Sequence, residues 1–393
     1  MKTLIELYDE RPLENVLSTE VFRPERTVYI CPEEVAKNSR TKKKLAEYMK
    51  HRGVKCQTVF LPALMFSADS VLRQLRRAVD SYEDCALDIT GGSDAALFAA
   101  GLLCADRDIP VFTYSRKRNA FFSIRGADFA EALPCPVQYR VEDFFLMAGG
   151  SMRRGRVDNR VLSRYDELYD PFFRLYLDHR SQWNRVVNYM QRISQTGKDE
   201  PVSLTVSGGF TLKGERGQMI SADEPTLRDM EKIGLISDLS VDEPRSVRFT
   251  FRDEQVRTWL RDIGSVLELY VYKACRDTGL FQDVVTSAVV DWEGDNRQGN
   301  VTNEIDVMAC MGVTPVFISC KTCAVSTEAL NELAVLRDRF GAGIARAAIV
   351  TGTNGTAIMR KRAAELDISV IELKDLRSGL IRERIKALAT AEN

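Results

Sequence analysis

The chain has 393 residues and a formal net charge of −1, so it can build about two or three domains but has no overall charge that would attract nucleic acid. No apolar run approaches a membrane span and the charged N-terminal segment is unlike a signal peptide, while nine scattered cysteines indicate buried thiols in a reducing cytoplasm. With only two histidines, far apart in the chain, neither a histidine-rich metal site nor a Ser-His-Asp triad is expected.

Residues 1 to about 140 alternate strand-like and helix-like segments, which predicts a parallel, doubly wound sheet. The expected strands are Thr3–Tyr8, Thr27–Cys31, Lys55–Leu61, Cys85–Thr90 and Pro110–Ser115. The helical patterns between them are Leu13–Glu20, Thr41–His51, Ser67–Ser81 and Ser93–Ala105. In sheets of this kind, ligands bind beyond the carboxyl ends of the strands. The loop residues that fall at this edge are Asp9, Glu10, Arg11, Thr90, Gly91, Gly92, Ser93, Ser115 and Arg116.

The loop from Thr90 to Ser93 has the residue types that bind phosphate. Its glycines let backbone N–H groups approach an anion, and the helix that follows adds its positive N-terminal end. A plain strand-to-helix turn capped by Ser93 explains the same residues equally well. Arg116 and the two basic residues after it could likewise neutralise phosphates or form an ordinary solvated loop.

Residues 146–253 break the alternation, and we expect a linker region with helices and a short hairpin there. Helical patterning extends over Tyr165–Ile193, and Gln195–Gln218 is rich in Gly, Ser and Thr. A basic run, Arg153–Arg156, resembles a solvated loop more than a nucleic-acid contact. The pattern does not predict a role for this region.

From Glu254 onward the predicted order of elements is α-β-β-β-α-β. The segments are a long helix over Glu254–Asp277, a strand over Val284–Trp292, two strands within Asn303–Lys321, a helix capped by Ser326 or Thr327, and a strand over Ala347–Thr351. A further helix, strand and basic terminal helix complete the chain.

The two strands within Asn303–Lys321 carry the residues of interest. Alternation sends Glu304 and Asp306 to one face of the first strand, and Ser319 and Lys321 to one face of the second. If the strands pair, carboxylates and an ammonium group meet. An exposed charged face of a hairpin would give the same pattern.

A site that combines carboxylates with an ammonium group suits the hydrolysis of phosphodiester bonds. A hard divalent cation neutralises developing charge and lowers the pKa of a water, and carboxylate and carbonyl oxygens suit Mg²⁺ or Mn²⁺. A nearby ammonium group can orient the attacking water or stabilise charge. A second interpretation concerns Cys320 and Cys323, whose spacing can mark a thiol redox site or half a zinc site. Two ordinary thiols would also fit.

Order and motif together resemble the PD-(D/E)xK nuclease superfamily. Asp306 matches its first acid and Lys321 its lysine. Glu304 matches an additional acid, and Glu268 matches the acid that many members carry on the first helix. Ser319 departs from the motif, because it stands where the second acid is expected. The metal ligands that the resemblance implies are Asp306, Glu268 and the backbone carbonyl of Cys320.

The whole chain resembles the CARF-domain nucleases of type III CRISPR defence. The stretches that carry this resemblance are Leu7–Glu10, Glu14–Leu17, Thr90–Ser93, Gly264–Tyr272, Asn303–Asp306 and Cys320–Lys321. The implied fold is α/β, with an N-terminal Rossmann-like parallel sheet, the CARF sensor, over residues 1–145. The linker region follows over 146–253, and a restriction-endonuclease-like domain spans 254–393.

The resemblance also implies a function. A homodimer would bind a cyclic oligoadenylate, most often the tetra-adenylate, at the loop residues of the sensor sheet named above. The nuclease domain would then cut single-stranded RNA or DNA with Mn²⁺ or Mg²⁺, in the cytoplasm, as part of antiviral defence. The alternative is a sensor without catalysis that regulates a partner, and Ser319 is the reason to keep it. A weaker expectation is that the sensor also degrades its own activator.

Overall fold

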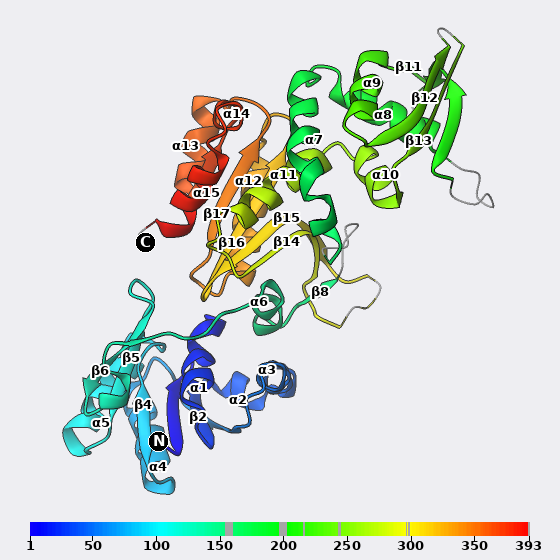
Figure 1. Cartoon of the computed structure of the whole chain (residues 1–393). Helices are drawn as coiled ribbons and strands as arrows, with labels where there is room; N and C mark the ends of the chain where they lie inside the picture. The colour runs from blue at the N-terminus through cyan, green and yellow to red at the C-terminus, as the bar shows by residue number, and fades with distance from the viewer. Residues whose placement is uncertain are drawn as a thin grey trace.

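The computed structural model describes residues 1–153, 160–195, 203–214, 217–242, 245–295, 297 and 299–391. Its two large sheets lie in separate halves of the molecule, with a smaller body of helices and short strands beside the second (Figure 1). Within the described part of the chain, no helix has both the length and the apolar character needed to cross a lipid bilayer.

The N-terminal sheet confirms the predicted α/β class. Its strand order is β3-β2-β1-β4-β5-β6-β7, with the first five strands parallel. The strands are β1 (Thr3–Leu7), β2 (Arg26–Cys31), β3 (Gln57–Pro62), β4 (Cys85–Asp88), β5 (Val111–Ser115), β6 (Ala120–Arg125) and β7 (Leu133–Pro134). The helices are α1 (Leu17–Phe22), α2 (Glu33–Lys37), α3 (Ser39–His51), α4 (Ala68–Ser81), α5 (Asp94–Asp106) and α6 (Val141–Met147).

Two strands at the edge of this sheet were not predicted. A turn over residues 116–119 sends the chain back, so β6 pairs antiparallel with β5. Asn119 closes the turn with a φ of 46°, a left-handed conformation that Asn tolerates better than most residues. The basic residues of this turn look like a solvated loop in the sequence, which hides the hairpin.

The two faces of the N-terminal sheet pack against different partners. Residues of α4 and α5, such as Leu75 and Leu103, cover one face. The other face shares a core with the C-terminal sheet, where Phe144 and Phe145 of α6 join Met308 and Phe317. The two sheets are therefore connected by a continuous apolar core rather than by the chain alone.

The C-terminal sheet has the predicted order of elements, α11-β14-β15-β16-α12-β17. Its strand order is β18-β17-β16-β15-β14-β8. The strands are β8 (Ser151–Arg153), β14 (Asp283–Asp291), β15 (Thr302–Met311), β16 (Thr314–Lys321), β17 (Arg346–Thr351) and β18 (Ile368–Ile371). The helices are α11 (Ser265–Asp277), α12 (Thr327–Phe340), α13 (Ala357–Glu365), α14 (Leu373–Arg377) and α15 (Ile381–Thr390).

The predicted long helix over Glu254–Asp277 is wrong, because it consists of α10 (Glu254–Leu260) and α11. The break comes where Asp262 Oδ1 accepts hydrogen bonds from the backbone N–H groups of Gly264, at 2.9 Å, and Ser265, at 3.0 Å. A carboxylate that binds these amides starts a new helix rather than continuing the old one. The helix predicted over Tyr165–Ile193 is likewise two, α7 (Asp166–Asp178) and α8 (Trp183–Ile193).

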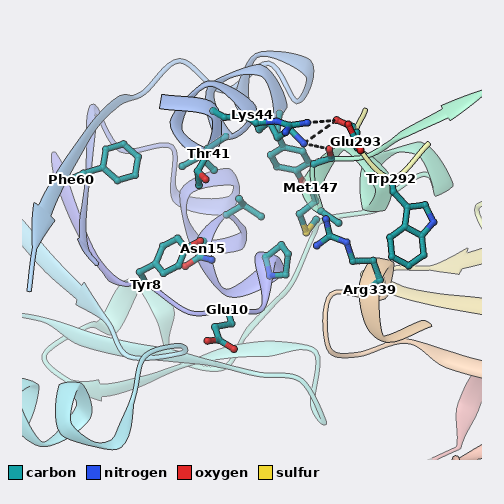
Figure 2. Close-up of a pocket in the computed structure, with 17 residues that line it drawn as sticks. Tyr8, Glu10, Asn15, Thr41, Lys44, Phe60, Met147, Trp292, Glu293 and Arg339 are labelled. Carbon is teal, nitrogen blue, oxygen red and sulfur yellow. Dashed lines mark hydrogen bonds between the residues drawn. The ribbon is translucent and has the colours of Figure 1, made fainter. Parts of the chain in front are cut away.

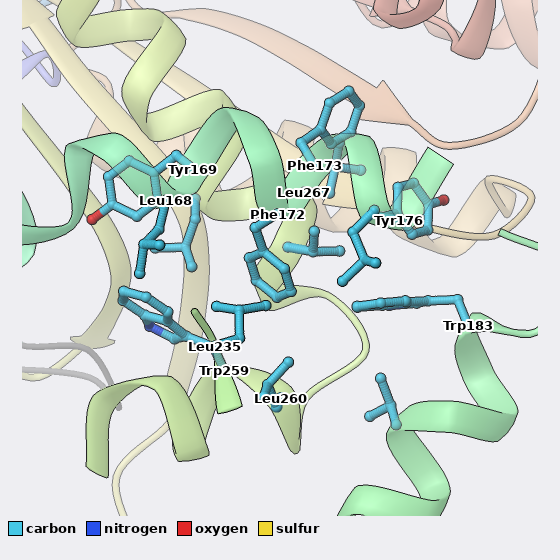
Figure 3. Close-up of a cluster of buried hydrophobic side chains, with 14 of the residues drawn as sticks. Leu168, Tyr169, Phe172, Phe173, Tyr176, Trp183, Leu235, Trp259, Leu260 and Leu267 are labelled. Atoms are coloured by element: carbon cyan, nitrogen blue, oxygen red, sulfur yellow. The ribbon is translucent and has the colours of Figure 1, made fainter. Parts of the chain in front are cut away.

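The region expected to be a linker packs on the C-terminal sheet. Trp183 and Phe172 lie in one apolar core with Trp259 of α10 and Leu267 of α11 (Figure 3). Beyond α7 and α8, the elements here are β9 (Thr205–Gly209), β10 (Thr211–Lys213), β11 (Met219–Ser221), α9 (Glu224–Lys232), β12 (Ile236–Asp242) and β13 (Ser246–Phe251). Apart from Arg153, the predicted basic run lies outside the described residues, as does part of Gln195–Gln218. The domain boundaries near residues 145 and 253 remain predictions.

A buried acid in the N-terminal sheet generates a test of stability. Glu6 is 1% exposed, its Oε1 atom has no hydrogen-bond partner, and it lies opposite Asp88 on the neighbouring strand. Burial, and then the charge of Asp88, raise the pKa of Glu6 well above its ordinary value. The group therefore favours the folded state at low pH, and this contribution is lost as pH rises through the raised pKa.

We expect Glu6→Gln to raise the thermal midpoint at pH 8 by roughly 2–4 °C, the shift that about 1 kcal/mol produces in a domain of about 150 residues. The difference from wild type should shrink toward pH 4, where the native acid is protonated. Thermal unfolding followed by circular dichroism at both pH values measures it, with the exposed Glu25→Gln as control. A Glu6→Gln effect that does not change with pH would contradict this account.

Candidate active site and ligand-binding loops

The C-terminal sheet opens like a fork between β15 and β16. Their pairing stops at Val307 and Ile318. Beyond that point β15 stays with β14, where Ile305 pairs with Ala288, and β16 stays with β17, where Lys321 pairs with Thr351. The opening contains a cavity of about 220 Å³. Glu304, Asp306, Ser319 and Lys321, together with Glu332 of α12, line it.

The side chain of Asp306 spans the fork. Its Oδ2 atom accepts hydrogen bonds from the backbone N–H of Cys320 at 2.6 Å and from Ser319 Oγ at 3.1 Å, and Lys321 Nζ lies 3.5 Å away. Although burial lowers the pKa of Lys321, the charge of Asp306 raises it overall, so the ammonium form is favoured. Ser319 is therefore a hydrogen-bond donor to the acid at the position where the superfamily has a second acid.

Glu268 reaches the same place from α11. Its Oε2 atom accepts a hydrogen bond from Ser287 Oγ at 3.2 Å. Burial first, and then the carboxylates of Asp306, Asp262 and Glu304, raise the pKa of Glu268 to about 8. Gly264 leaves space for the Glu268 side chain, because a Cβ atom at position 264 would lie 2.7 Å from Glu268 Oε1.

Two residues of this site were missed in the sequence. Ser287 lies within β14 with a φ of 52°, a strained conformation that directs its hydroxyl to Glu268. Asp262 adds a carboxylate through the turn that starts α11, and the Asp-x-Gly-Ser spacing at 262–265 was the available signal.

A second cavity, of about 450 Å³, extends from the carboxylates toward the expected linker region, which includes α8. Its lining adds polar side chains that the acid and lysine motif does not include. They are Gln191 of α8, Gln195 after it, Thr258 of α10, and Arg261 in the turn before α11. The site is thus a groove lined by carboxylates together with amide and guanidinium groups.

The donor atoms fit a hard cation. Glu268, Asp306 and Glu304 offer carboxylate oxygens, and the pKa of Glu268 is raised first by burial and then by the charges of its acidic neighbours. Mg²⁺ or Mn²⁺ would offset both effects. Over the described residues, no three His, Cys, Asp or Glu side chains form a ready cluster for a metal ion. Backbone oxygen and water would therefore have to complete the coordination.

The thiol interpretation finds little support. Cys320 is 4% exposed, and burial, followed by the charge of Asp306, raises the pKa of its thiol well above the ordinary value. A reactive thiol needs the opposite shift. Cys323 is exposed and unpaired with Cys320.

In the N-terminal domain the loops after β1 and β4 are in contact. Asp9 Oδ2 accepts a hydrogen bond from the N–H of Gly92 at 3.1 Å, and Asp9 Oδ1 accepts from Arg11 Nε at 2.9 Å. Burial raises the pKa of Asp9, but the hydrogen bonds from Arg11 lower it overall. A Cβ on Gly91 would lie 2.9 Å from that of Asp9. Asp9 therefore organises these loops.

Most of the other predicted loop residues form hydrogen bonds within the N-terminal domain. Thr90 Oγ1 accepts from the N–H of Tyr114 at 2.7 Å. Ser93 caps α5 by accepting from Ala96 N–H at 3.3 Å, and its hydroxyl donates to the carbonyl of Met65. Glu10 is exposed. Ser115 Oγ accepts from the N–H of Arg118 at 3.4 Å.

Arg116 connects these loops to the C-terminal domain. It forms an ion pair with Glu14, a carboxylate whose side chain is 1% exposed, and its Nη1 donates to the carbonyl of Gly343 at 3.4 Å. Arg11 Nε lies 3.9 Å from the same Glu14. Glu14 belongs to a stretch that carries the family resemblance but is not among the predicted site residues. In the structure Glu14 lies between the two arginines and adjoins Gly91.

The geometry defines a class of protein in which a Rossmann-like α/β sheet is joined to a restriction-endonuclease-like domain. Residues 253–389 match the family model of the Card1-like endonuclease domain. Among solved structures, protein VC1899 from Vibrio cholerae has a TM-score of 0.76 at 17% identity, covering 100% of this chain and 99% of that one. Can2 from Sulfobacillus thermosulfidooxidans, solved with cyclic tetra-adenylate, has a TM-score of 0.70 at 16% identity, covering 99% and 98%.

A search among curated proteins finds no match. The family match of the C-terminal domain and the shared fold of the whole chain confirm the resemblance to CARF-domain nucleases that the sequence indicated.

The loop glycines generate a second test. Gly92 has a φ of +97° and a Cβ there would lie 2.7 Å from that of Leu7, whereas Gly53, with a φ of +66°, has open space around it. We expect Gly92→Ala to lower the free energy of unfolding by roughly 1–3 kcal/mol more than Gly53→Ala. Both substitutions place a Cβ on a left-handed backbone, but only the Cβ at position 92 would collide with Leu7. Urea unfolding of both variants measures the difference, and equal losses would contradict it.

Proposed function

We propose that the protein is a metal-dependent endonuclease that cuts single-stranded RNA or DNA when a cyclic oligoadenylate binds its N-terminal domain. The observation that carries the nuclease assignment is the meeting of Glu268, Asp306 and Lys321 in the fork of the sheet. This fork lies within the residues that match the Card1-like endonuclease domain.

Asp306, Glu268 and the backbone carbonyl of Cys320 would hold Mn²⁺ or Mg²⁺, with Glu304 supplying the charge that Ser319 lacks. The cation would neutralise developing charge on the phosphate and acidify a water. Lys321 keeps its ammonium form beside Asp306, so it can orient that water or stabilise the phosphate charge. The groove beside the carboxylates is where the strand to be cut would lie.

The N-terminal loops would bind the activator. The loop of Gly91 and Gly92, the start of α5, and Arg11 and Arg116 lie at the edge where parallel sheets bind ligands. The two arginines are paired with Asp9 and Glu14, and a bound phosphate would share or replace these acidic partners. That Can2 was solved with cyclic tetra-adenylate makes the same ring the first ligand to test. The setting would be CRISPR antiviral defence in the cytoplasm.

An apolar surface supports a homodimer. Leu97, Phe98 and Leu102 of α5 are 39%, 63% and 37% exposed, and Phe66 before α4 is 83% exposed. Exposed apolar groups gathered on neighbouring elements mark contact surfaces. A two-fold partner here would bring two copies of the loop before α5 together around a symmetric ring.

The alternative, a sensor without catalysis, is favoured by one observation. Ser319 gives Asp306 a hydrogen bond where the superfamily has a second carboxylate. Such a protein would bind the activator tightly and leave RNA and DNA intact with every metal.

The catalytic test uses labelled single-stranded RNA and DNA with Mn²⁺, with and without cyclic tetra-adenylate. We expect activator-dependent cleavage by wild type and a fall of about 100-fold or more for Lys321→Ala, because one charged group at developing charge is worth that much. The exposed Lys361→Ala should match wild type. Full activity in Lys321→Ala would refute the assignment, and absence of cleavage by wild type with tight activator binding would favour the sensor.

The activator test compares two neighbouring arginines. We expect Arg116→Gln to weaken cyclic tetra-adenylate binding by about tenfold or more, because it removes a charge-assisted contact with a phosphate. Arg118 is placed over the ring of Phe122, 5.3 Å from its centroid, so Arg118→Gln should bind normally. Isothermal titration calorimetry gives both affinities. Equal affinities for the two variants would show that the activator does not contact Arg116.

A further inference from the structure

A cavity of about 440 Å³ lies between the N-terminal domain and the C-terminal sheet (Figure 2). Residues from the loop after β1, from α3 and from β3 form one side, and residues near the ends of α6, β14 and α12 form the other. Of the predicted activator residues, Glu10 alone is among the described residues that line it. The cavity is therefore distinct from the loops around Gly92, although the loop after β1 borders both.

Three cations gather at this cavity, Arg40 and Lys44 of α3 and Arg339 of α12. Lys44 Nζ donates to the carbonyls of Gly149 and, at 3.1 Å, Glu293, and Arg40 Nη2 donates to the Glu293 carbonyl at 3.3 Å. These acceptors are neutral, and within the described ranges no carboxylate forms an ion pair with the three cations. Two carboxylates, Glu10 and Glu293, also line the cavity, so its described lining holds three cations against two acids, and none of the three cations is ion-paired with a described residue.

The cations also repel one another. Burial first, and then the charges of Arg40 and Arg339, lower the pKa of Lys44, while the charges of Asp295 and Glu293 act in the opposite direction. The backbone amides of Arg40 and Thr41 already donate to Asn38 Oδ1, so the start of α3 adds little free capacity and the side chains carry the charge. An anion among the three would relieve the repulsion.

Aromatic rings form much of the remaining wall. Tyr8 and Phe60 lie across the cavity from Trp292 and Arg339 (Figure 2). Their positions are fixed from behind, because Phe60 stacks on Tyr29 at 5.2 Å and Trp292 donates from Nε1 to Asn303 Oδ1 at 2.8 Å. Rigid rings next to cations provide stacking and charge at once.

We propose that this cavity binds a nucleoside phosphate, with the phosphate among Arg40, Lys44 and Arg339 and the base against the aromatic wall. The volume lies in the range of about 300–1,000 Å³ that holds a single small ligand, and a ring of four nucleotides would exceed it. Since both domains line the cavity, a bound nucleotide would hold them together. This inference does not depend on the proposed nuclease activity.

The test is titration of the full-length protein with the four ribonucleoside monophosphates, with inorganic phosphate and uncharged nucleosides as separate arms. Tryptophan fluorescence locates the site, because Trp183 and Trp259 are 1% and 0% exposed in another core, while Trp292 lines the cavity. We expect a saturable fluorescence change with at least one monophosphate, and weaker binding of phosphate and nucleoside alone. Binding should persist with saturating cyclic tetra-adenylate.

Variants then test the residues. The double variant Arg40→Gln with Arg339→Gln should bind the nucleotide about tenfold or more weakly, because it removes two charged contacts. Arg339→Lys, which keeps the charge, should bind more tightly than Arg339→Gln, and Lys50→Gln, on α3 but outside the cavity lining, should match wild type. Equal affinity of the double variant and wild type, phosphate binding as tight as nucleotide, loss of binding with the activator, or no binding at all would overturn the proposal.

Discussion

The hydrogen bond from the N–H of Cys320 to Asp306 Oδ2, 2.6 Å long, is the constraint on which the candidate active site depends. It lies where the backbone pairing between β15 and β16 has already stopped. The Asp306 side chain therefore accepts the hydrogen bond that a backbone carbonyl of the neighbouring strand would otherwise accept. Without it, the diverging strands would leave an unpaired buried N–H and a carboxylate with no fixed orientation. With it, the acid, the serine and the lysine are held on one side of the opening.

A second constraint, the packing of α11, explains why the acids can be close together. Three carboxylates, those of Asp306, Asp262 and Glu304, act on Glu268, and the hydroxyl of a strained Ser287 donates a hydrogen bond to one of its oxygens. Strain and like-charge repulsion both cost folding free energy, and they persist only where the surrounding structure enforces them. The apolar core that α11 shares with α7, α8 and α10 supplies that enforcement. The expected linker region, through α7 and α8, therefore stabilises the site even where it does not contribute a side chain to it.

Much of the fold could be predicted because its signals are local. The alternation in Asn303–Lys321 predicts that Asp306 and Lys321 share a side, and the structure places them 3.5 Å apart. Ser287 could not be predicted, since its role depends on a left-handed backbone that no neighbouring residue specifies. The role of Glu14 was not predicted for a related reason, because a carboxylate between Arg11 and Arg116 is a tertiary arrangement. The break before α11 was missed although Asp262 and Gly264 were visible, because the apolar period continues across them.

Net charge was the least informative part of the sequence. A sum of −1 hides a strong local separation, with carboxylates gathered in the fork of the C-terminal sheet and three cations gathered at the domain junction. Opposite charges pair wherever the fold lets them meet, as Arg116 does with Glu14. Two clusters of opposite predominant charge in one molecule therefore mean that the fold keeps them apart, and external ions of the opposite sign can stabilise each of them. The acidic cluster matches a divalent cation and the basic one matches a phosphate, so the two clusters would respond to different ligands within a single chain.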